Sequence, residues 1–452
     1  MNRKFFKVLL FILIVFMVAL SCLVAYKEYY KLELADIKFL EYNKEDNTLK
    51  IKISRVLNLI NSDFTCNAKG LKNSFKNNSK NDSCILDLPF DDSYEIFLSN
   101  KQGIKTKIVP LNSSVNEILS FDFRLDTVYL IPEEEKEIEY TDIKIGDNIS
   151  YNFKSENESV ARIENNKIIG VKSGETYVYS DITDKKLRVV VTDLITKPYA
   201  ISERKTLLTC NAYSEDEAKL LDNILAYKIN EAGYQTRAGA VAAARFLTLE
   251  FAYRVPYFYE NGRVHFSGVH QADGEGRYYK TGLYLSDSKK DLITASWKGP
   301  AIWGCNLMNL ESRPEYGYIM GKMMPNGLDC SGFVTWSLKN AGFDPGDIGA
   351  GESPEIDYQC TDLGEFVPLT RDLINSGRLK AGDLINWWGH IGMIIGIDDE
   401  DGKIYVAESL SYIGGVRAMI YTKQNIMDTF SFVVLMDDYY KKDGNYTKMW
   451  NK

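Results

Sequence analysis

Hydrophobic and polar positions follow different periods along the chain, and the first segment is apolar throughout. An uncharged run over residues 8–26 follows the basic residues Arg3, Lys4 and Lys7. At about 1.5 Å rise per residue, a helix over this run is long enough to cross a bilayer. Positive charge on the short N-terminal side favours keeping that end in the cytoplasm. We therefore expect residues 1–27 to be a cytoplasmic N-terminus and transmembrane anchor, with the rest of the chain outside.

Two alternatives for this N-terminal segment remain open. A cleaved signal peptide has a shorter apolar stretch and a small-residue cleavage site, neither of which stands out here. A lipoprotein modified at Cys22 needs a lipobox, which Ala19, Leu20 and Ser21 fit poorly, and the apolar run continues beyond the cysteine. A single-pass anchor in the cell membrane is the preferred interpretation.

Short alternating segments, separated by Asn, Asp, Ser and Gly, follow the anchor. Residues 49–55 and 94–98 alternate apolar and polar side chains, as strands with one buried face do. We expect a β-rich domain over residues 35–118, a small β-sandwich of immunoglobulin-like form. Cys66 and Cys84 flank a polar, turn-rich stretch and are the one pair that we expect to form a structural disulfide; two separate thiols are the alternative.

A second strand-rich segment, residues 125–195, has a sharper pattern. Its runs at 159–163, 166–171 and 173–176 are SVARI, NKIIGV and SGET. This series resembles the bacterial immunoglobulin-like domains of the invasin and intimin type. The resemblance implies a spacer that holds a working domain away from the membrane, or an adhesive domain.

Helical spacing replaces the strand pattern after Pro198. Residues 216–232 and the Ala-rich stretch 236–253 have the spacing of packed helices. We expect residues 200–298 to be either a helical subdomain or an extension of the domain that follows. The expected fold is therefore multidomain, with a transmembrane helix, two β-sandwich domains and a C-terminal α+β domain.

Composition and charge add two restrictions. With 452 residues the chain is too long for one compact core, since domains commonly have about 100–200 residues. A hydrophobic content of 45% and a charged content of 26% are typical of folded proteins. The net charge of -8 argues against a nucleic-acid partner, because phosphate binding needs clustered Lys and Arg.

The stretch NGLDCSGFVTWSLKN places a cysteine where a Gly-bearing turn leads into an apolar helix. At a helix N-terminus, free N–H groups and the dipole favour a thiolate, so we expect the pKa of Cys330 to lie below the usual ~8.5. Cys330 is the predicted nucleophile, with the backbone of Ser331 and the neighbouring Asp329 in oxyanion binding or substrate positioning. Cys305 and Cys360 open no such helix and are expected to be structural thiols.

A thiol nucleophile needs a base, and the chain contains only three histidines. His390 opens an apolar strand at GHIGMIIGI and is the predicted base. His265 and His270 lie in a Gly-rich polar stretch without metal-ligand spacing, so we expect loop residues there and no metal site. Glu408, on the next strand, is the predicted third member that holds the imidazole; a surface glutamate on an edge strand is the alternative.

The order DCSGF, GDLINWWGHIGMIIGI and a polar residue on the following strand resembles the NlpC-type cell-wall cysteine peptidases. The upstream PAIWGC also resembles that family's Pro-Tyr-x-Trp-Gly-Gly segment, which precedes the nucleophile and lines the cleft, so Trp303 is expected to position substrate. The resemblance covers residues 299–438 and implies a papain-like domain that cleaves the peptide stems of peptidoglycan without a metal or organic cofactor.

This sequence departs from the family pattern at several points. Ala301 stands where the family commonly has a tyrosine, and Tyr316 or Tyr318 are candidates to replace it. Glu408 stands where a histidine is more usual, and it suits the same orienting role through a charged acceptor. Two long insertions flank the nucleophile helix, so the motif alone does not imply the substrate specificity of the family's cleft.

The expected function is that of a membrane-anchored endopeptidase cutting between D-glutamate and the diamino acid of the stem peptide. The alternatives are an amidase that separates the glycan from its first L-alanine, and a wall-binding or adhesive surface protein without catalysis. Expected partners are peptidoglycan stem peptides and the cytoplasmic membrane, and a regulator or a secretion or conjugation machinery is left unidentified. The catalytic domain is expected outside the cytoplasm, facing the wall.

Overall fold

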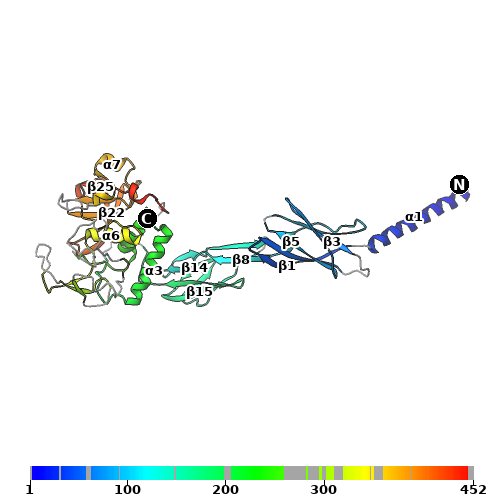
Figure 1. Ribbon diagram of the computed structural model, residues 1–452, viewed down its shortest axis with the longest axis horizontal. Coiled ribbons are helices and arrows are strands. Elements are labelled where there is room, and N and C mark those ends of the chain that lie inside the picture. Colours follow the sequence, from blue (N-terminus) through cyan, green and yellow to red (C-terminus); the bar gives the residue numbers. More distant parts are fainter. Residues whose placement is uncertain are drawn as a thin grey trace. The chain divides into compact units, whose positions relative to one another are not determined.

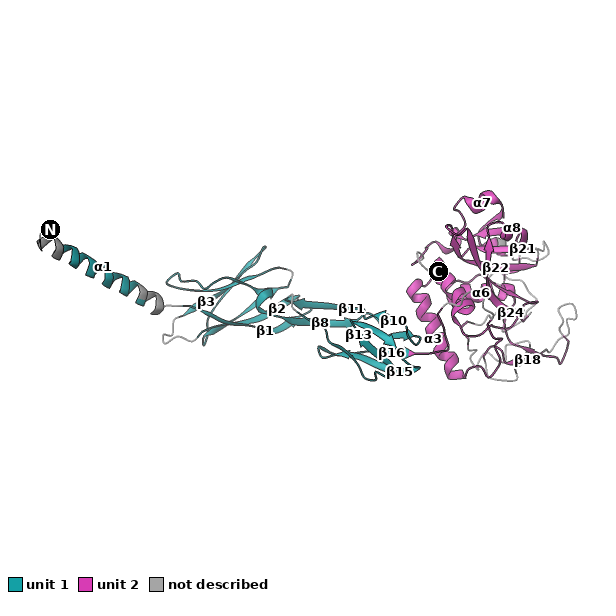
Figure 2. Ribbon diagram, turned by 180° about the vertical axis from the view of Figure 1, so that it is seen from behind, with its two compact units in different colours: residues 1–190 teal, residues 191–452 magenta. Residues whose placement is uncertain are grey.

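The computed structural model describes most of the chain and divides it into two compact units, Met1–Val190 and Val191–Lys452 (Figure 1, Figure 2). The protein is multidomain and mostly β-sheet, with several sandwich-like sheets and few helices. The described residues are 3–29, 32–56, 63–90, 92–146, 149–197, 205–258, 281–283, 295–297, 302–309, 319–346, 348–350, 360–387 and 389–445.

The first unit begins with helix α1 (Arg3–Tyr29), over the run expected to be an anchor. In the described part of the chain, no helix combines the length and the apolar character needed to cross a membrane.

The first β-sandwich consists of two antiparallel sheets, as the alternating pattern predicts. Strand β2 shows the pattern most clearly, since Leu49, Ile51 and Ile53 are buried and the residues between them are half-exposed. The bridge between Cys66 on β3 and Cys84 on β5 joins the two sheets, so the expected disulfide is confirmed and the alternative of two separate thiols is wrong. One sheet has the order β1 (Leu34–Asn43), β2 (Thr48–Arg55) and β5 (Ser83–Pro89). The other has the order β4 (Ser74–Asn78), β3 (Phe64–Lys69), β6 (Glu95–Asn100) and β7 (Val109–Pro110). The short helix α2 (Leu111–Ser114) follows β7.

The second strand-rich region also has sandwich-like sheets, consistent with an immunoglobulin-like domain. Its longest strand, β16, buries Leu187, Val189 and Val191 on one face. The sheets are β8 (Glu117–Phe123) with β11 (Tyr140–Ile145), then β12 (Phe153–Ser155), β15 (Gly174–Ser180), β16 (Thr183–Val191) and β9 (Thr127–Leu130) in that order, and β10 (Glu135–Glu137), β14 (Lys167–Gly170) and β13 (Ala161–Glu164) in that order.

The second unit starts with the helices that the sequence predicts. Helix α3 (Glu215–Ala232) begins at a capping box in which Ser214 and Glu217 each bond the other's backbone N–H. Helix α4 (Arg237–Arg245) follows, and it continues as a π-helical turn, η1 (Phe246–Glu250). The Ala-rich face of α4 is buried and packs against α3 and α6. The helical segment therefore belongs to the same compact unit as the predicted catalytic residues.

One six-stranded antiparallel sheet forms the centre of this unit, and helix α6 (Cys330–Asn340) packs against two of its strands, β22 and β23 (Figure 1). The order is β20 (Glu365–Pro368), β25 (Phe432–Leu435), β21 (Leu384–Trp387), β22 (His390–Asp398), β23 (Lys403–Leu410) and β24 (Gly415–Thr422). The remaining elements are β17 (Ala295–Trp297), β18 (Asn306–Asn309), β19 (Met323–Pro325), η3 (Cys360–Leu363), α7 (Arg371–Asn375), α8 (Asn425–Thr429) and α9 (Asp437–Tyr440).

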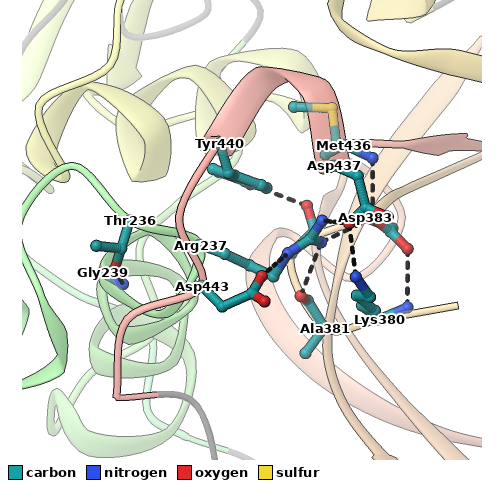
Figure 3. A network of polar contacts seen from close by, with 11 residues as sticks. Thr236, Arg237, Gly239, Lys380, Ala381, Asp383, Met436, Asp437, Tyr440 and Asp443 are labelled. Carbon is teal, nitrogen blue, oxygen red and sulfur yellow. Dashed lines mark hydrogen bonds and ion pairs between the residues drawn. The ribbon is translucent and has the colours of Figure 1, made fainter.

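A buried ion pair connects α4 to the start of β21. Arg237 Nη1 lies 2.8 Å from Asp383 Oδ1, and both side chains are 1% exposed. Figure 3 shows the same guanidinium bonded to the carbonyl of Ala381 and to Asp443, and Tyr440 lies with its ring centroid 4.8 Å from the guanidinium carbon. This network holds the strand that pairs with the His390 strand.

Replacing Arg237 by methionine is expected to lower the free energy of unfolding of the second unit by about 3–5 kcal/mol, since it leaves the buried carboxylate of Asp383 without its cation. All six tryptophans lie in this unit, so urea unfolding followed by tryptophan fluorescence reports on it alone. The matched control is Arg378→Met, because Arg378 pairs with Glu365 at the surface, where a pair contributes about 0–1 kcal/mol. Equal losses in the two variants would contradict the prediction.

Candidate active site

Cys330 is the first residue of α6, as the sequence predicts. Asp329 is the N-cap, and its Oδ1 accepts a hydrogen bond from the N–H of Gly332 at 2.8 Å. Just before it, the backbone at Gly327 passes so close to Pro256 that a Cβ would meet the carbonyl oxygen at 1.9 Å. The Gly-bearing turn is therefore required by packing, and it directs the chain into the helix.

Cys330 is 7% exposed, and this burial changes the acidity of its thiol. Burial, together with the negative charge of Asp329, raises the pKa of Cys330 to about 12, although the backbone N–H groups of Ile391, Ser331 and Cys330 itself act in the opposite direction. The prediction of a lowered pKa was wrong, because the helix terminus is outweighed by desolvation. Cys330 is thus a thiol near neutral pH and needs a base to remove its proton.

His390 is the first residue of β22 and is 3% exposed. Trp387, its partner across the β21–β22 pairing, stacks on the imidazole with ring centroids 4.1 Å apart. Helix α6 packs against β22, and the backbone N–H of the next residue, Ile391, acts to lower the pKa of the Cys330 thiol. The fold therefore brings the predicted nucleophile to the point in the sheet where the predicted base begins its strand.

Glu408 lies on β23, an inner strand between β22 and β24, and is fully buried. Its Oε2 is 2.8 Å from Nε2 of His390. Its Oε1 accepts two hydrogen bonds from Arg417, from Nε at 3.0 Å and Nη2 at 2.8 Å. Burial and then the negative charge of this carboxylate raise the pKa of the Tyr421 hydroxyl. The alternative of a surface glutamate on an edge strand is wrong.

The bond to Glu408 determines which imidazole nitrogen is free. An ionised carboxylate can only accept hydrogen bonds, so Nε2 of His390 must donate the proton in that 2.8 Å contact. Neutral imidazole has one N–H, and Nδ1 is then the nitrogen with a lone pair. This tautomer is the one that can accept a proton from a thiol.

The other predicted site residues lie around the start of α6. Ser331 is buried, with its hydroxyl 3.4 Å from Oδ1 of Asp329. Trp303 is 1% exposed, and its ring centroid lies 5.5 Å from that of Trp336 in α6. In this structure Asp329 caps the helix and Trp303 supports it, while their roles toward oxyanion and substrate stay predictions.

Several predicted positions lie outside the described residues: His265, His270, Ala301, Tyr316 and Tyr318. Among the residues that are described, no three His, Cys, Asp or Glu side chains form a group that could hold a metal ion.

Arg417 and Tyr421 are the site residues that sequence reasoning missed. Both are on β24, and the β23–β24 register places Arg417 directly opposite Glu408. A short turn containing Gly414 joins the two strands. A predicted hairpin between β23 and β24 would have placed Arg417 beside Glu408.

Cys305 is not a free thiol but forms a disulfide with Cys210, 95 residues earlier. This corrects the expectation that only Cys66 and Cys84 would pair. Cys305 also accepts a backbone hydrogen bond from Asn326, at 2.9 Å, just before the turn that leads to the nucleophile. The disulfide therefore fixes the segment from which α6 starts. Cys360 is a buried free thiol, as expected, 3.2 Å from Nδ2 of Asn386.

The pKa of Cys330 predicts how its alkylation by iodoacetamide depends on pH. With a pKa of about 12, the thiolate fraction and hence the rate should rise about tenfold per pH unit from pH 7 to pH 10. The alkylation rate of glutathione in the same tube should level off above an ordinary thiol pKa of about 8.5. Mass spectrometry of the Cys330 peptide measures the rate. A plateau that begins below pH 7 would show a preformed thiolate and contradict this prediction.

Comparison with known proteins gives little beyond this geometry. The chain matches no protein-family model and no curated protein. Among solved structures, it is similar to the three N-terminal domains of the Highly Immunogenic Outer Capsid protein (Hoc) of bacteriophage RB49, at 11% sequence identity and a TM-score of 0.16. That match covers 39% of this chain and 65% of the phage chain, slightly less than two thirds of its length.

Proposed function

We propose that the second unit is a cysteine hydrolase of the papain-like kind that cleaves peptide amide bonds. The observation that supports this most directly is the arrangement at His390. The imidazole bonds through Nε2 to the buried carboxylate of Glu408, and helix α6, which Cys330 opens, packs against β22, the strand that His390 opens. A thiol at a helix N-terminus beside an oriented imidazole is the arrangement that thiol acyl transfer requires.

The proposed reaction uses only side chains and backbone of this chain. His390 Nδ1 takes the proton from Cys330, and the sulfur attacks the carbonyl carbon of the substrate. The N–H groups of Cys330 and Ser331, at the start of α6, stabilise the oxyanion. His390 then donates the proton to the leaving amine as the C–N bond breaks. Water, deprotonated by His390, hydrolyses the thioester and regenerates the thiol.

The substrate class in this proposal is the peptide stem of peptidoglycan, which the resemblance to NlpC-type peptidases implies. The test is incubation of the full-length chain, in mild detergent, with purified peptidoglycan and identification of released fragments by mass spectrometry. Fragments with a new amine on the diamino acid and a free D-glutamate carboxyl support the endopeptidase. Glycan strands released from intact stems indicate the amidase instead. Binding without fragments would overturn the hydrolase in favour of a wall-binding protein.

The proposal also places the catalytic unit outside the cytoplasm, held by α1, with the β-sandwich domains as spacers. Two disulfides, one in each unit, support an oxidising compartment, because such bonds are rare in the cytosol. The uncharged run over residues 8–26 supports a membrane anchor. Alkaline carbonate should leave the protein in the membrane fraction, and detergent should release it. Release by carbonate alone would contradict the proposal of a membrane anchor.

A further inference from the structure

The carboxylate of Glu408 is held on both of its oxygens. His390 contacts Oε2, at 2.8 Å, and Arg417 donates to Oε1 through two nitrogens in a side-on geometry. Both Arg417 bonds end on Oε1, so the plane of the carboxylate is fixed by Arg417 on one oxygen together with His390 on the other. The side chain of Arg417 is 19% exposed, whereas that of Glu408 is wholly buried.

Burial makes the charge of Glu408 depend on a cation. An ionised carboxylate removed from water is stable only when it is paired and hydrogen-bonded. The charged and titratable groups that act on it are His390 on β22 and Arg417 and Tyr421 on β24. Tyr412, before β24, lies against the Arg417 guanidinium, and Cys330 and Asp329 lie at the start of α6, which packs against β22 and β23. His390 is neutral for part of a catalytic cycle. Of these groups, Arg417 is the cation that remains charged throughout.

We infer that Arg417 is a positioning residue, which keeps Glu408 ionised while His390 is neutral and so leaves Nδ1 of His390 free to take the proton of Cys330. The inference deepens the proposed function and rests on it, since Cys330 is the proton donor. Arg417 acts through Glu408 and touches no reacting atom in this scheme. Its bonds to Oε1 leave Oε2 as an acceptor for Nε2–H, which fixes the tautomer.

Loss of the Arg417 charge has the same consequence for Nδ1 whether Glu408 or His390 binds the additional proton. Removing a positive charge favours the protonated form of every neighbouring group. If the proton goes to Glu408, the carboxyl group donates to Nε2, and the imidazole proton moves to Nδ1. If the proton stays on His390, the ring is an imidazolium with both nitrogens protonated. In each case Nδ1 is protonated and cannot act as the base.

Nitrogen NMR of the full-length chain labelled with ¹⁵N-histidine tests this without any wall substrate. Only three histidines are present, and His390→Gln assigns the signal. The wild type should show the proton of the neutral ring on Nε2 and a bare Nδ1. In Arg417→Met, a larger fraction of Nδ1 should be protonated than in the wild type at the same pH. In Arg417→Lys, which keeps the charge, the wild-type behaviour should largely return. A bare Nδ1 over the same pH range in Arg417→Met overturns the inference.

Two control measurements distinguish a folding defect from a change at His390. Tryptophan fluorescence shows whether each variant unfolds in urea like the wild type, and Arg378→Met, at a surface pair in the same unit, should leave the NMR signal of His390 unchanged. If Arg417→Met fails to fold, Arg417→Gln replaces it, because glutamine removes the charge but keeps hydrogen-bond donors. A more protonated Nδ1 in this variant supports the inference, and a bare Nδ1 as in the wild type overturns it. On peptidoglycan, kcat should fall with KM unchanged. A wild type with bare Nδ1 but no hydrolysis would contradict the proposed function and leave the role of Arg417 intact.

Discussion

Replacing Cys330 by alanine is expected to reduce the release of peptide fragments from peptidoglycan by a factor of about 10⁵–10⁶, to the background of the assay. Loss of the nucleophile in an enzyme that forms a covalent intermediate has an effect of this order, because the remaining groups have no atom to which the acyl group can be transferred. Among the described thiols, Cys330 is the one at the start of an α-helix that packs against the His390 strand. Mass spectrometry of released fragments over time measures the rate.

Cys360 provides a matched control in the same unit. It is also a free thiol and is more deeply buried than Cys330, but it lies against Asn386 rather than His390. Cys360→Ala should therefore retain fragment release, apart from any loss of stability seen in urea. If Cys330→Ala and wild type release fragments at the same rate, the hydrolase proposal fails.

Replacing Glu408 by glutamine is expected to lower kcat by about 10³–10⁴, with little change in KM. Removing the group that orients a catalytic imidazole has an effect of this size when the wrong tautomer results. A glutamine amide can present N–H₂ to Nε2, and the proton of the neutral ring then lies on Nδ1. In that orientation the amide oxygen can still accept the two Arg417 hydrogen bonds, so the variant mainly removes the carboxylate charge and the acceptor for Nε2–H. Steady-state kinetics on a defined stem peptide measures both constants.

Glu365→Gln is the control for this substitution. Glu365 also pairs with an arginine, Arg378 at 2.6 Å, but at the surface of the same unit, and kcat should stay at the wild-type value. A Glu408→Gln variant that unfolds in urea like the wild type and keeps full kcat would exclude an orienting role for Glu408.

Local patterns predicted the parts of the site that are local in origin. Cys330 at a helix start and His390 at a strand start follow from a turn and a change of hydrophobic period within a few residues. The alternation in residues 49–55 likewise predicted strand β2 and the side of it that is buried. These features depend on near neighbours, so the sequence contains most of what determines them.

Properties that depend on tertiary packing could not be predicted in this way. The pKa of Cys330 rises because other elements bury it, and no pattern around residue 330 indicates how much water remains. Cys210 and Cys305 are 95 residues apart, and their pairing depends on how the intervening chain folds. Arg417 becomes part of the site only through the register of β23 with β24, which a propensity argument does not fix.

The disulfide between Cys210 and Cys305 limits the conditions under which the proposed chemistry can be studied. Thiol enzymes are routinely kept in strong reductant so that the nucleophile is not oxidised. In this protein the same reductant acts on a cross-link that closes a 95-residue loop, and removing such a cross-link typically costs about 2–5 kcal/mol of stability. Cys330 is itself shielded by burial. Preparations made without reductant, or with a brief mild treatment, should therefore be the active ones.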